Sequence, residues 1–144
     1  MKVEDLIQAR TEVFTVTEDT TVHETARYLR EKQVRSVGVI TSDGKLAGVV
    51  SQSDVSDKVA AENKCPAWMR VSEIMTSHPI TVPPATSLDE CVLLMEKHGF
   101  FHLAVIDERG SYRGMISVQD ILRVIASDEK ARADMLESFL FSAR

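Results

Sequence analysis

The feature that most constrains this chain is an internal repeat. Residues 15–55 align with residues 81–121 at a constant shift of 66 positions and without a gap. The best-matched stretch is Gly48 to Asp54 (GVVSQSD), which corresponds to Gly114 to Asp120 (GMISVQD). A constant shift over this length indicates two supersecondary units of one design within one chain.

Each unit predicts the same order of elements, β-α-β-β-α. A β-prone run is followed by a capping box, Thr21 to Glu24 or Ser87 to Glu90, which starts a helix. Two apolar runs joined by a glycine-containing turn predict a hairpin. A second helix begins near Ser51 or Ser117. The predicted strands span residues 13–16, 37–40 and 46–50 in the first unit, and residues 80–82, 103–106 and 112–116 in the second.

The repeat also sets the predicted domain organisation. We expect a first repeat over residues 1–62, a linker over 63–72, a second repeat over 73–127 and a C-terminal amphipathic helix over 128–144. The predicted fold class is α+β (mixed α/β), with two tandem repeats in one pseudo-twofold module. The apolar side of the C-terminal helix either packs on this chain or a dimer mate, or docks another protein; it comprises Met135, Leu136, Phe139, Leu140 and Phe141.

Composition argues against several classes of function. The net charge of −5 disfavours non-specific nucleic-acid binding, which needs a basic surface. No apolar run approaches the roughly 20 residues that span a bilayer. The N-terminus lacks a signal-type apolar core, so we expect a cytoplasmic protein with no membrane partner. The two cysteines, Cys65 and Cys91, do not form a disulfide framework.

Catalytic and metal sites have no support in the sequence. It contains no Gly-x-Gly-x-x-Gly, no P-loop and no Cys-His or Ser-His spacing that stands out. No His/Cys pair shows the local spacing of a zinc site. We therefore expect neither an enzyme nor a metal-binding protein.

The repeated Ser-x-x-Asp stretch has two interpretations. Ser51 with Asp54, and Ser117 with Asp120, fit the capping-box template and can serve only to start helices. The same geometry suits a nucleotide, because a helix N-terminus attracts phosphate and an acceptor-only carboxylate can bind two ribose hydroxyls. The sequence by itself leaves both interpretations open.

The duplicated β-α-β-β-α order, the Asp43-Gly44 turn and the paired Gly-x-x-Ser-x-x-Asp ends resemble a tandem pair of CBS domains, a Bateman module. Residues 71–82 (VSEIMTSHPITV) resemble the start of a second CBS repeat, and the resemblance runs from Val3 to Ile125. It implies a regulatory module that requires no cofactor and binds an adenine nucleotide (AMP, ADP, ATP or NAD-type) or S-adenosylmethionine between its repeats. It also implies a homodimer that acts on an unidentified effector protein.

The resemblance further implies two crossed clefts, in which the Asp of one repeat faces the first strand and pre-strand segment of the other. The cleft of Asp54 would combine Ser51, Ser53, Asp54, Met75, Thr76, His78, Ile80, Phe100, Phe101 and His102. The cleft of Asp120 would combine Phe14, Val34, Arg35, Ser36, Ser117, Gln119 and Asp120.

Departures from the family pattern separate these clefts. Ser53 stands where stand-alone relatives often carry an arginine, which predicts a weaker grip on phosphate. Phe14 is bulky for a residue that flanks a base, and it would partly fill the second cleft. We therefore expect the Asp54 cleft to be the main ligand site. The alternative is a structural interaction protein whose clefts stay empty and whose Ser/Asp pairs are only caps.

Overall fold

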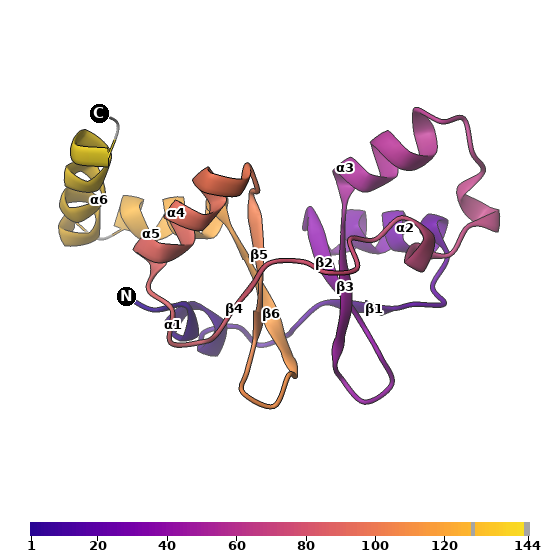
Figure 1. The fold of residues 1–144 in the computed structure, drawn as a ribbon, viewed down its shortest axis with the longest axis horizontal. Coiled ribbons are helices and arrows are strands. Elements are labelled where there is room, and N and C mark those ends of the chain that lie inside the picture. Colours follow the sequence, from indigo (N-terminus) through magenta and orange to yellow (C-terminus); the bar gives the residue numbers. More distant parts are fainter. Residues whose placement is uncertain (128, 143–144) are drawn as a thin grey trace.

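Two three-stranded sheets, one from each repeat, lie side by side at the centre of the molecule (Figure 1). In the computed structural model, which describes residues 1–127 and 129–142, the first two strands of each sheet are parallel and the third is antiparallel to the second. The first sheet contains β1 (Thr15–Thr17), β2 (Ser36–Ile40) and β3 (Leu46–Ser51). The second contains β4 (Thr81–Val82), β5 (His102–Ile106) and β6 (Tyr112–Ser117).

The helices follow the predicted order. Helices α2 (Val22–Lys32) and α4 (Leu88–His98) separate the first and second strands of their sheets. Helices α3 (Gln52–Val55) and α5 (Val118–Ser127) follow the third strands. Helix α3 continues as a turn of π-helix, η1 (Ser56–Ala60), and the linker contains a turn of 3-10 helix, η2 (Pro66–Trp68). The predicted mixed α/β fold with two β-α-β-β-α units is confirmed.

The two predicted helix caps are present. The Thr21 hydroxyl oxygen accepts a hydrogen bond from the Glu24 amide at 3.0 Å, and Ser87 accepts one from the Glu90 amide at 3.2 Å. Each bond satisfies a backbone N–H group that has no partner within the helix. The capping residues therefore fix where α2 and α4 begin.

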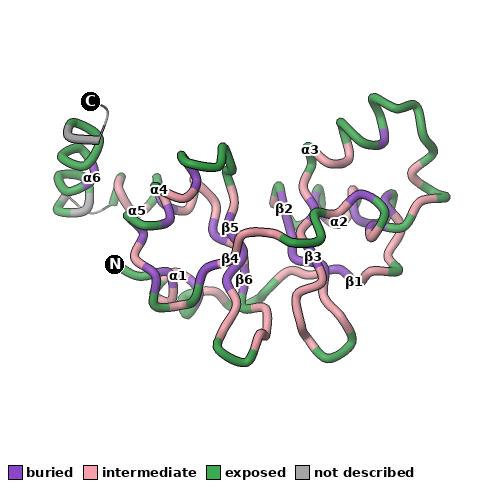
Figure 2. Tube along the Cα trace, in the orientation of Figure 1, coloured by how far each residue is buried: buried purple, intermediate pink, exposed green. Residues whose placement is uncertain are grey.

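Each half of the molecule has its own hydrophobic core, and Figure 2 shows the buried residues gathered in the strands and the adjoining helix faces. Alternate residues of β2 and β5 point into these cores. The first core comprises Val16, Val22, Leu29, Val37, Val39, Val50, Val59, Val71 and Ile74. The second comprises Val3, Ile7, Val82, Leu88, Cys91, Met95, Leu103, Val105, Ile116, Ile121 and Met135.

The segments that lead into the two repeats are exchanged between the cores. The first lead-in segment (residues 3–10) contains α1 (Val3–Gln8), which packs in the second core although the chain then continues into the first sheet. The second lead-in segment (residues 71–76) contains the 3-10 helix η3 (Val71–Glu73), which packs in the first core. A division that places residues 1–62 in one repeat therefore separates α1 from the core in which it packs.

Equivalent hydrogen bonds fix the two lead-in segments. The Val3 amide donates to the Thr86 carbonyl at 2.8 Å, and the Val71 amide donates to the Thr20 carbonyl at 2.8 Å. Both valine side chains are completely buried. The exchange is therefore symmetric: each half is hydrogen-bonded to the segment that leads into the sheet of the other half.

The two sheets meet through β2 and β6, on faces that turn away from the cores. A Cβ atom at Gly38 would lie 2.6 Å from Cζ of the Tyr112 ring, which is closer than real Cβ contacts. Burial raises the pKa of Tyr112 above its ordinary value, as expected for a phenol enclosed between two sheets. Gly38 therefore permits the close approach of the two halves.

The last helix of the described residues is α6 (Glu129–Ser142). Met135 packs in the second core, whereas the exposed fractions of Leu136, Phe139 and Leu140 are 57%, 50% and 65%. The Phe141 side chain, and Asp128, Ala143 and Arg144 of the predicted C-terminal helix, lie outside the described part of the chain. Within residues 1–127 and 129–142, no helix combines the length and apolar character needed to cross a bilayer.

Replacing Gly38 with alanine is expected to destabilise the protein by about 1–3 kcal/mol, because the added methyl group overlaps the Tyr112 ring. Urea unfolding of the two proteins measures this difference. The cost of Gly38→Ala should shrink in a Tyr112→Ser background, where the ring is gone. An unchanged free energy of unfolding for Gly38→Ala would show that the sheets do not meet at this point.

Candidate functional site

Both copies of the repeated motif form complete helix caps. The Ser51 amide donates to Oδ2 of Asp54 at 2.9 Å, and the Asp54 amide donates to the Ser51 hydroxyl oxygen at 3.3 Å. The Ser117 amide donates to Oδ2 of Asp120 at 2.8 Å, and the Asp120 amide donates back at 3.1 Å. Each carboxylate is thereby held at a helix start with lone pairs still available.

The Asp54 carboxylate is paired with a lysine from its own repeat. Lys58 Nζ lies 3.0 Å from Asp54 Oδ1 and donates a hydrogen bond of 2.8 Å to the Ile74 carbonyl oxygen. Ile74 belongs to the second lead-in segment. Lys58 therefore links the first motif to the segment that leads into the second sheet. We call such a link between a motif carboxylate and a lead-in segment a clasp.

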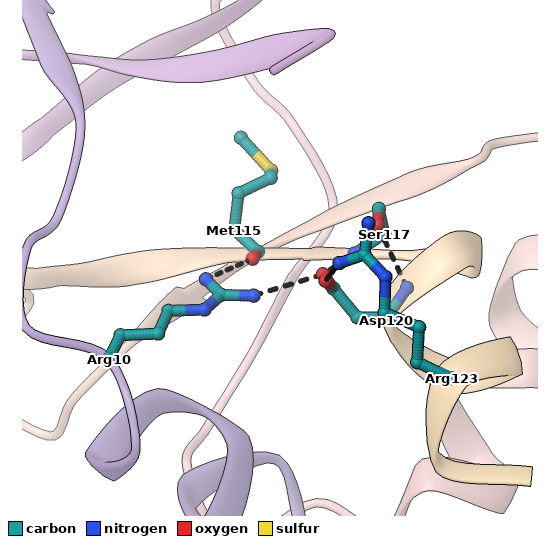
Figure 3. A network of polar contacts seen from close by, with 5 residues as sticks. All are labelled: Arg10, Met115, Ser117, Asp120 and Arg123. Atoms are coloured by element: carbon teal, nitrogen blue, oxygen red, sulfur yellow. Dashed lines mark hydrogen bonds and ion pairs between the residues drawn. The ribbon is translucent and has the colours of Figure 1, made fainter. Parts of the chain in front are cut away.

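The Asp120 carboxylate is paired with an arginine from the first lead-in segment, as Figure 3 shows. Arg10 Nη2 lies 2.9 Å from Asp120 Oδ2, and Arg10 Nη1 donates to the Met115 carbonyl oxygen at 2.6 Å. Arg123 approaches the other carboxylate oxygen, with Nη1 3.5 Å from Oδ1. Arg10 therefore clasps the second motif to the segment that leads into the first sheet.

The motif glycines make room for the lead-in segments. A Cβ atom at Gly48 would lie 2.6 Å from the Thr76 carbonyl oxygen and 2.8 Å from Met75 Sδ. A Cβ atom at Gly114, where φ is +147°, would lie 2.7 Å from Ile7 Cδ1. A side chain at Gly48 would collide with the backbone of the lead-in segment, and one at Gly114 would displace the end of the Ile7 side chain and strain the backbone.

The second lead-in segment is also hydrogen-bonded to β3. The Val49 amide donates to the Thr76 carbonyl at 3.0 Å, and the Thr76 amide donates to the Val49 carbonyl at 2.9 Å. Met75 packs against the first core. The structure thus brings Met75 and Thr76 into the neighbourhood of the Asp54 motif.

The starts of β2 and β5 lie, through their backbones, beside the motif of their own repeat. Ser36 pairs with Ser51, and the Arg35 carbonyl accepts from the Gln52 amide at 2.9 Å. These contacts join residues assigned to the Asp120 cleft to the Asp54 motif. The physical reason is hairpin geometry, since the first strand of an antiparallel pair begins where the second strand ends.

The second repeat shows the same relation. His102 pairs with Ser117, and the Phe101 carbonyl accepts from the Val118 amide at 3.0 Å. Phe101 and His102, which the sequence assignment groups with Asp54, therefore lie beside the Asp120 motif. The lead-in segments cross between the repeats, whereas the backbone at each strand start pairs within its own repeat.

Charges from both repeats act on His102. Burial lowers the pKa of His102, the nearby negative charge of Asp120 opposes this, and the positive charge of Arg35 adds to it. Ser36 occupies the position in the first repeat that His102 occupies in the second. Among the described residues, its hydroxyl oxygen is the one buried side-chain polar atom without a hydrogen-bond partner.

The remaining predicted site residues are dispersed. Phe14 is half-buried, with its ring edge-on to Tyr28 at 6.2 Å between centroids, and Phe100 is exposed and stacks on His98 at 5.7 Å. Val34 packs against the first core and Ile80 against the second. Ser53, His78 and Gln119 are also exposed.

Arg10 is the functional candidate that the sequence does not reveal. It lies outside the stretch that repeats at a constant shift, so no equivalent residue marks it. A pocket of about 200 Å³ opens beside it and is lined by Leu6, Arg10, Asp120, Arg123, Val124 and Ser127. In the described part of the chain, no group of three or more His, Cys, Asp and Glu side chains is arranged to hold a metal ion.

Replacing His102 with glutamine is expected to flatten the pH dependence of stability in mildly acidic solution. The unfolded chain binds a proton at His102 with a pKa of about 6.5, whereas the folded protein binds it with a lower pKa. Stability should therefore fall as pH drops from about 6.5 toward the folded pKa, and be unaffected by His102 above that range.

Unfolding by urea at a series of pH values measures this effect. His23→Gln, on the exposed side of α2, is the matched control and should keep the dependence of the unsubstituted protein. Equal slopes for His102→Gln and the unsubstituted protein would contradict the burial of a neutral imidazole at this position.

Comparison with known proteins connects both repeats to one family. The family model for the CBS domain matches residues 3–61 and 71–127. An uncharacterised protein from Methanopyrus kandleri is 31% identical over 116 residues, which cover 81% of this chain and 59% of that protein. A homoserine O-acetyltransferase from Methanohalobium evestigatum is 30% identical over 114 residues, covering 79% of this chain and 22% of the enzyme. The chain therefore spans less than two thirds of the length of these relatives.

Solved structures share the arrangement of the two halves. A CBS-domain protein from Burkholderia ambifaria superposes with a TM-score of 0.81 at 31% identity, covering 89% of this chain and 96% of that one. The CBS domain pair of protein MJ0100, solved with 5′-methylthioadenosine and S-adenosylmethionine, gives 0.79 at 24% identity, with coverages of 88% and 97%. A CBS domain protein from Pyrobaculum aerophilum complexed with AMP gives 0.76 at 22% identity, with coverages of 84% and 90%.

The likeness to the latter two structures is one of fold, whereas the family match rests on the sequence of both repeats. The matched residues include both Gly-x-x-Ser-x-x-Asp motifs and both lead-in segments from Val3 and Val71 onward. This chain belongs to the CBS domain family, of which it contains two tandem repeats.

Proposed function

We propose that this chain is a regulatory module that binds an adenine nucleotide (AMP, ADP, ATP or NAD-type) between its repeats and performs no chemistry itself. The observation that carries the proposal is the pair of clasps. Lys58 joins the Asp54 motif to Ile74, and Arg10 joins the Asp120 motif to the first lead-in segment. Each motif carboxylate thus lies where one half meets the segment that leads into the sheet of the other half, and a ligand there can change this contact.

The chemistry at each motif matches the parts of a nucleotide. A carboxylate accepts hydrogen bonds from two adjacent ribose hydroxyls. A guanidinium group and a helix N-terminus both favour phosphate. The unpaired, buried hydroxyl of Ser36 and the neutral imidazole of His102 supply further polar groups between the motifs. Partly buried apolar side chains of the lead-in segments, such as Leu6 and Met75, can flank a base.

Known structures of the same fold support the ligand class. One was solved with AMP and another with 5′-methylthioadenosine and S-adenosylmethionine, all of which contain adenosine. An S-adenosylmethionine-type ligand is therefore the main alternative to a nucleotide for this chain. The other alternative is a structural protein, in which the Ser/Asp pairs serve only as helix caps.

The proposed output is a change in how the halves pack, relayed to an effector protein. A ligand that alters the clasps acts on lead-in segments that are buried in both cores, which couples the site to the whole module. We also propose a homodimer, because exposed leucines lie on helices at the surface of the second half, with Leu93 56% exposed on α4 and Leu122 55% exposed on α5. A monomeric mass by light scattering would contradict it.

Thermal unfolding with AMP, ATP, NAD and S-adenosylmethionine tests the ligand proposal. A ligand at 100 times its dissociation constant should stabilise the folded protein by about 2.7 kcal/mol and raise the melting temperature. The double substitution Asp54→Ala with Asp120→Ala should abolish the shift. No shift with any of the four compounds at millimolar concentration would sink the ligand-sensing proposal.

A matched control separates ligand binding from helix capping. Ser87→Ala removes the cap of α4, far from both motifs in the sequence, at a cost of about 1 kcal/mol. It should lower the melting temperature of the free protein but leave the ligand-induced shift intact. If the Asp substitutions behave like Ser87→Ala, the carboxylates are only caps.

A further inference from the structure

The two motifs, which are equivalent in sequence, have different charge environments. Within the described residues, Asp54 has one ion-pair partner, Lys58, whereas Asp120 has two, Arg10 and Arg123. The position that Arg123 occupies after Asp120 is held by an acid, Asp57, after Asp54. The surroundings of Asp120 therefore carry an excess of positive charge, and those of Asp54 do not.

The excess charge faces a pocket. The cavity of about 200 Å³ beside Asp120 is lined by both guanidinium groups, the carboxylate and the aliphatic side chains of Leu6 and Val124. With two arginines and one aspartate, its charged lining sums to one positive charge. A group with negative charge is the complement of such a lining.

Arg10 can bind a further acceptor in addition to, or in place of, its present ones. It binds two acceptors of the second repeat, the Asp120 carboxylate and the Met115 carbonyl, through two different nitrogens (Figure 3). A guanidinium has five N–H donors, so donors remain for a further acceptor. Its side chain is 31% exposed, which leaves it within reach of a ligand that enters beside Asp120.

Lys58 differs in this respect. Its ammonium group is a point charge that binds Asp54 and the Ile74 carbonyl, and an ammonium cannot present the planar, two-pronged donor set that matches a phosphate. The first motif therefore contains no counterpart of Arg10.

We propose that Arg10 selects a phosphorylated ligand at the Asp120 motif. On binding, the phosphate takes over the guanidinium from Asp120, and the freed carboxylate accepts the ribose hydroxyls. Without a ligand, the Asp120 carboxylate thus occupies the guanidinium that a phosphate would bind. A nucleoside without phosphate leaves the Arg10–Asp120 ion pair intact. This inference rests on the proposed function and adds the ligand's charge class. It reverses the preference for Asp54 expected from the sequence, because the sequence does not show that Arg10 reaches Asp120.

Calorimetric titration with AMP and adenosine tests the proposal. Both titrations use the Asp54→Ala variant, which lacks the carboxylate of the first motif, so that the measured binding is at the Asp120 motif. In that background AMP should bind more tightly than adenosine. Adding Arg10→Gln should weaken AMP binding by about 10-fold or more and leave adenosine binding unchanged or tighter, since it removes a charge-assisted hydrogen bond to phosphate alone.

Two further variants keep the result decisive. Arg30→Gln removes the same charge from the exposed surface of α2 and should preserve the preference for AMP. Arg10→Lys keeps the charge but loses the two-pronged donor set, so the preference should decrease by less than in Arg10→Gln. If Arg10→Gln does not fold, by circular dichroism, Arg10→Lys supplies the comparison.

The possible failures are distinguishable. Unchanged preference for AMP in the Arg10 variants would overturn the role of Arg10 while leaving nucleotide binding established. An equal fall in AMP and adenosine affinity would also overturn it, because it would reveal a purely structural contact. If the unsubstituted protein binds neither compound, this inference is wrong, whereas the proposed function is wrong only if ATP, NAD and S-adenosylmethionine also fail to shift the melting temperature.

Discussion

The exchange of lead-in segments between the two halves is the constraint on which the rest of the structure depends. Val3 and Val71 are each completely buried in one core, while the chain that follows each of them runs on into the sheet of the other half. Their amides make equivalent hydrogen bonds, to Thr86 and Thr20. Neither core is complete without a segment that belongs to the path of the other, so the halves cannot separate without exposing buried valines to water. This topology, more than any single contact across the boundary, makes the two repeats one module.

The same exchange creates the candidate site. It lays the lead-in segments against the ends of β3 and β6, where Gly48 and Gly114 provide the space. The motif carboxylates follow directly, and each is bound by a cation that also donates a hydrogen bond to a backbone carbonyl. A ligand that competes for these cations necessarily acts on the segments that complete the cores. Sensing and coupling to the rest of the module are therefore properties of one set of contacts.

Much of this could be predicted from the sequence, because the information is local or repeated. The shift of 66 residues gives the order of strands and helices, and Thr21 and Ser87 mark the helix starts that the structure shows. The site was harder to predict. Hairpin pairing places Arg35 and Ser36 beside Ser51, a relation that follows from the predicted strands, whereas contacts between the two repeats do not follow from either hairpin alone. The contact of Arg10 with Asp120 joins residues 110 positions apart, and it depends on where α1 packs, which no local pattern determines.

The most direct test of this account is a crystal structure of the protein grown with AMP. AMP is expected beside the second motif, with its ribose hydroxyls on the Asp120 carboxylate and its phosphate on the Arg10 guanidinium, which has left Asp120. The contrary result is AMP bound away from both motifs, or a ribose on Asp120 with the phosphate in solvent and no contact to Arg10. The first contrary result would remove the motifs from ligand binding, and the second would leave the excess positive charge at Asp120 without a role in recognition.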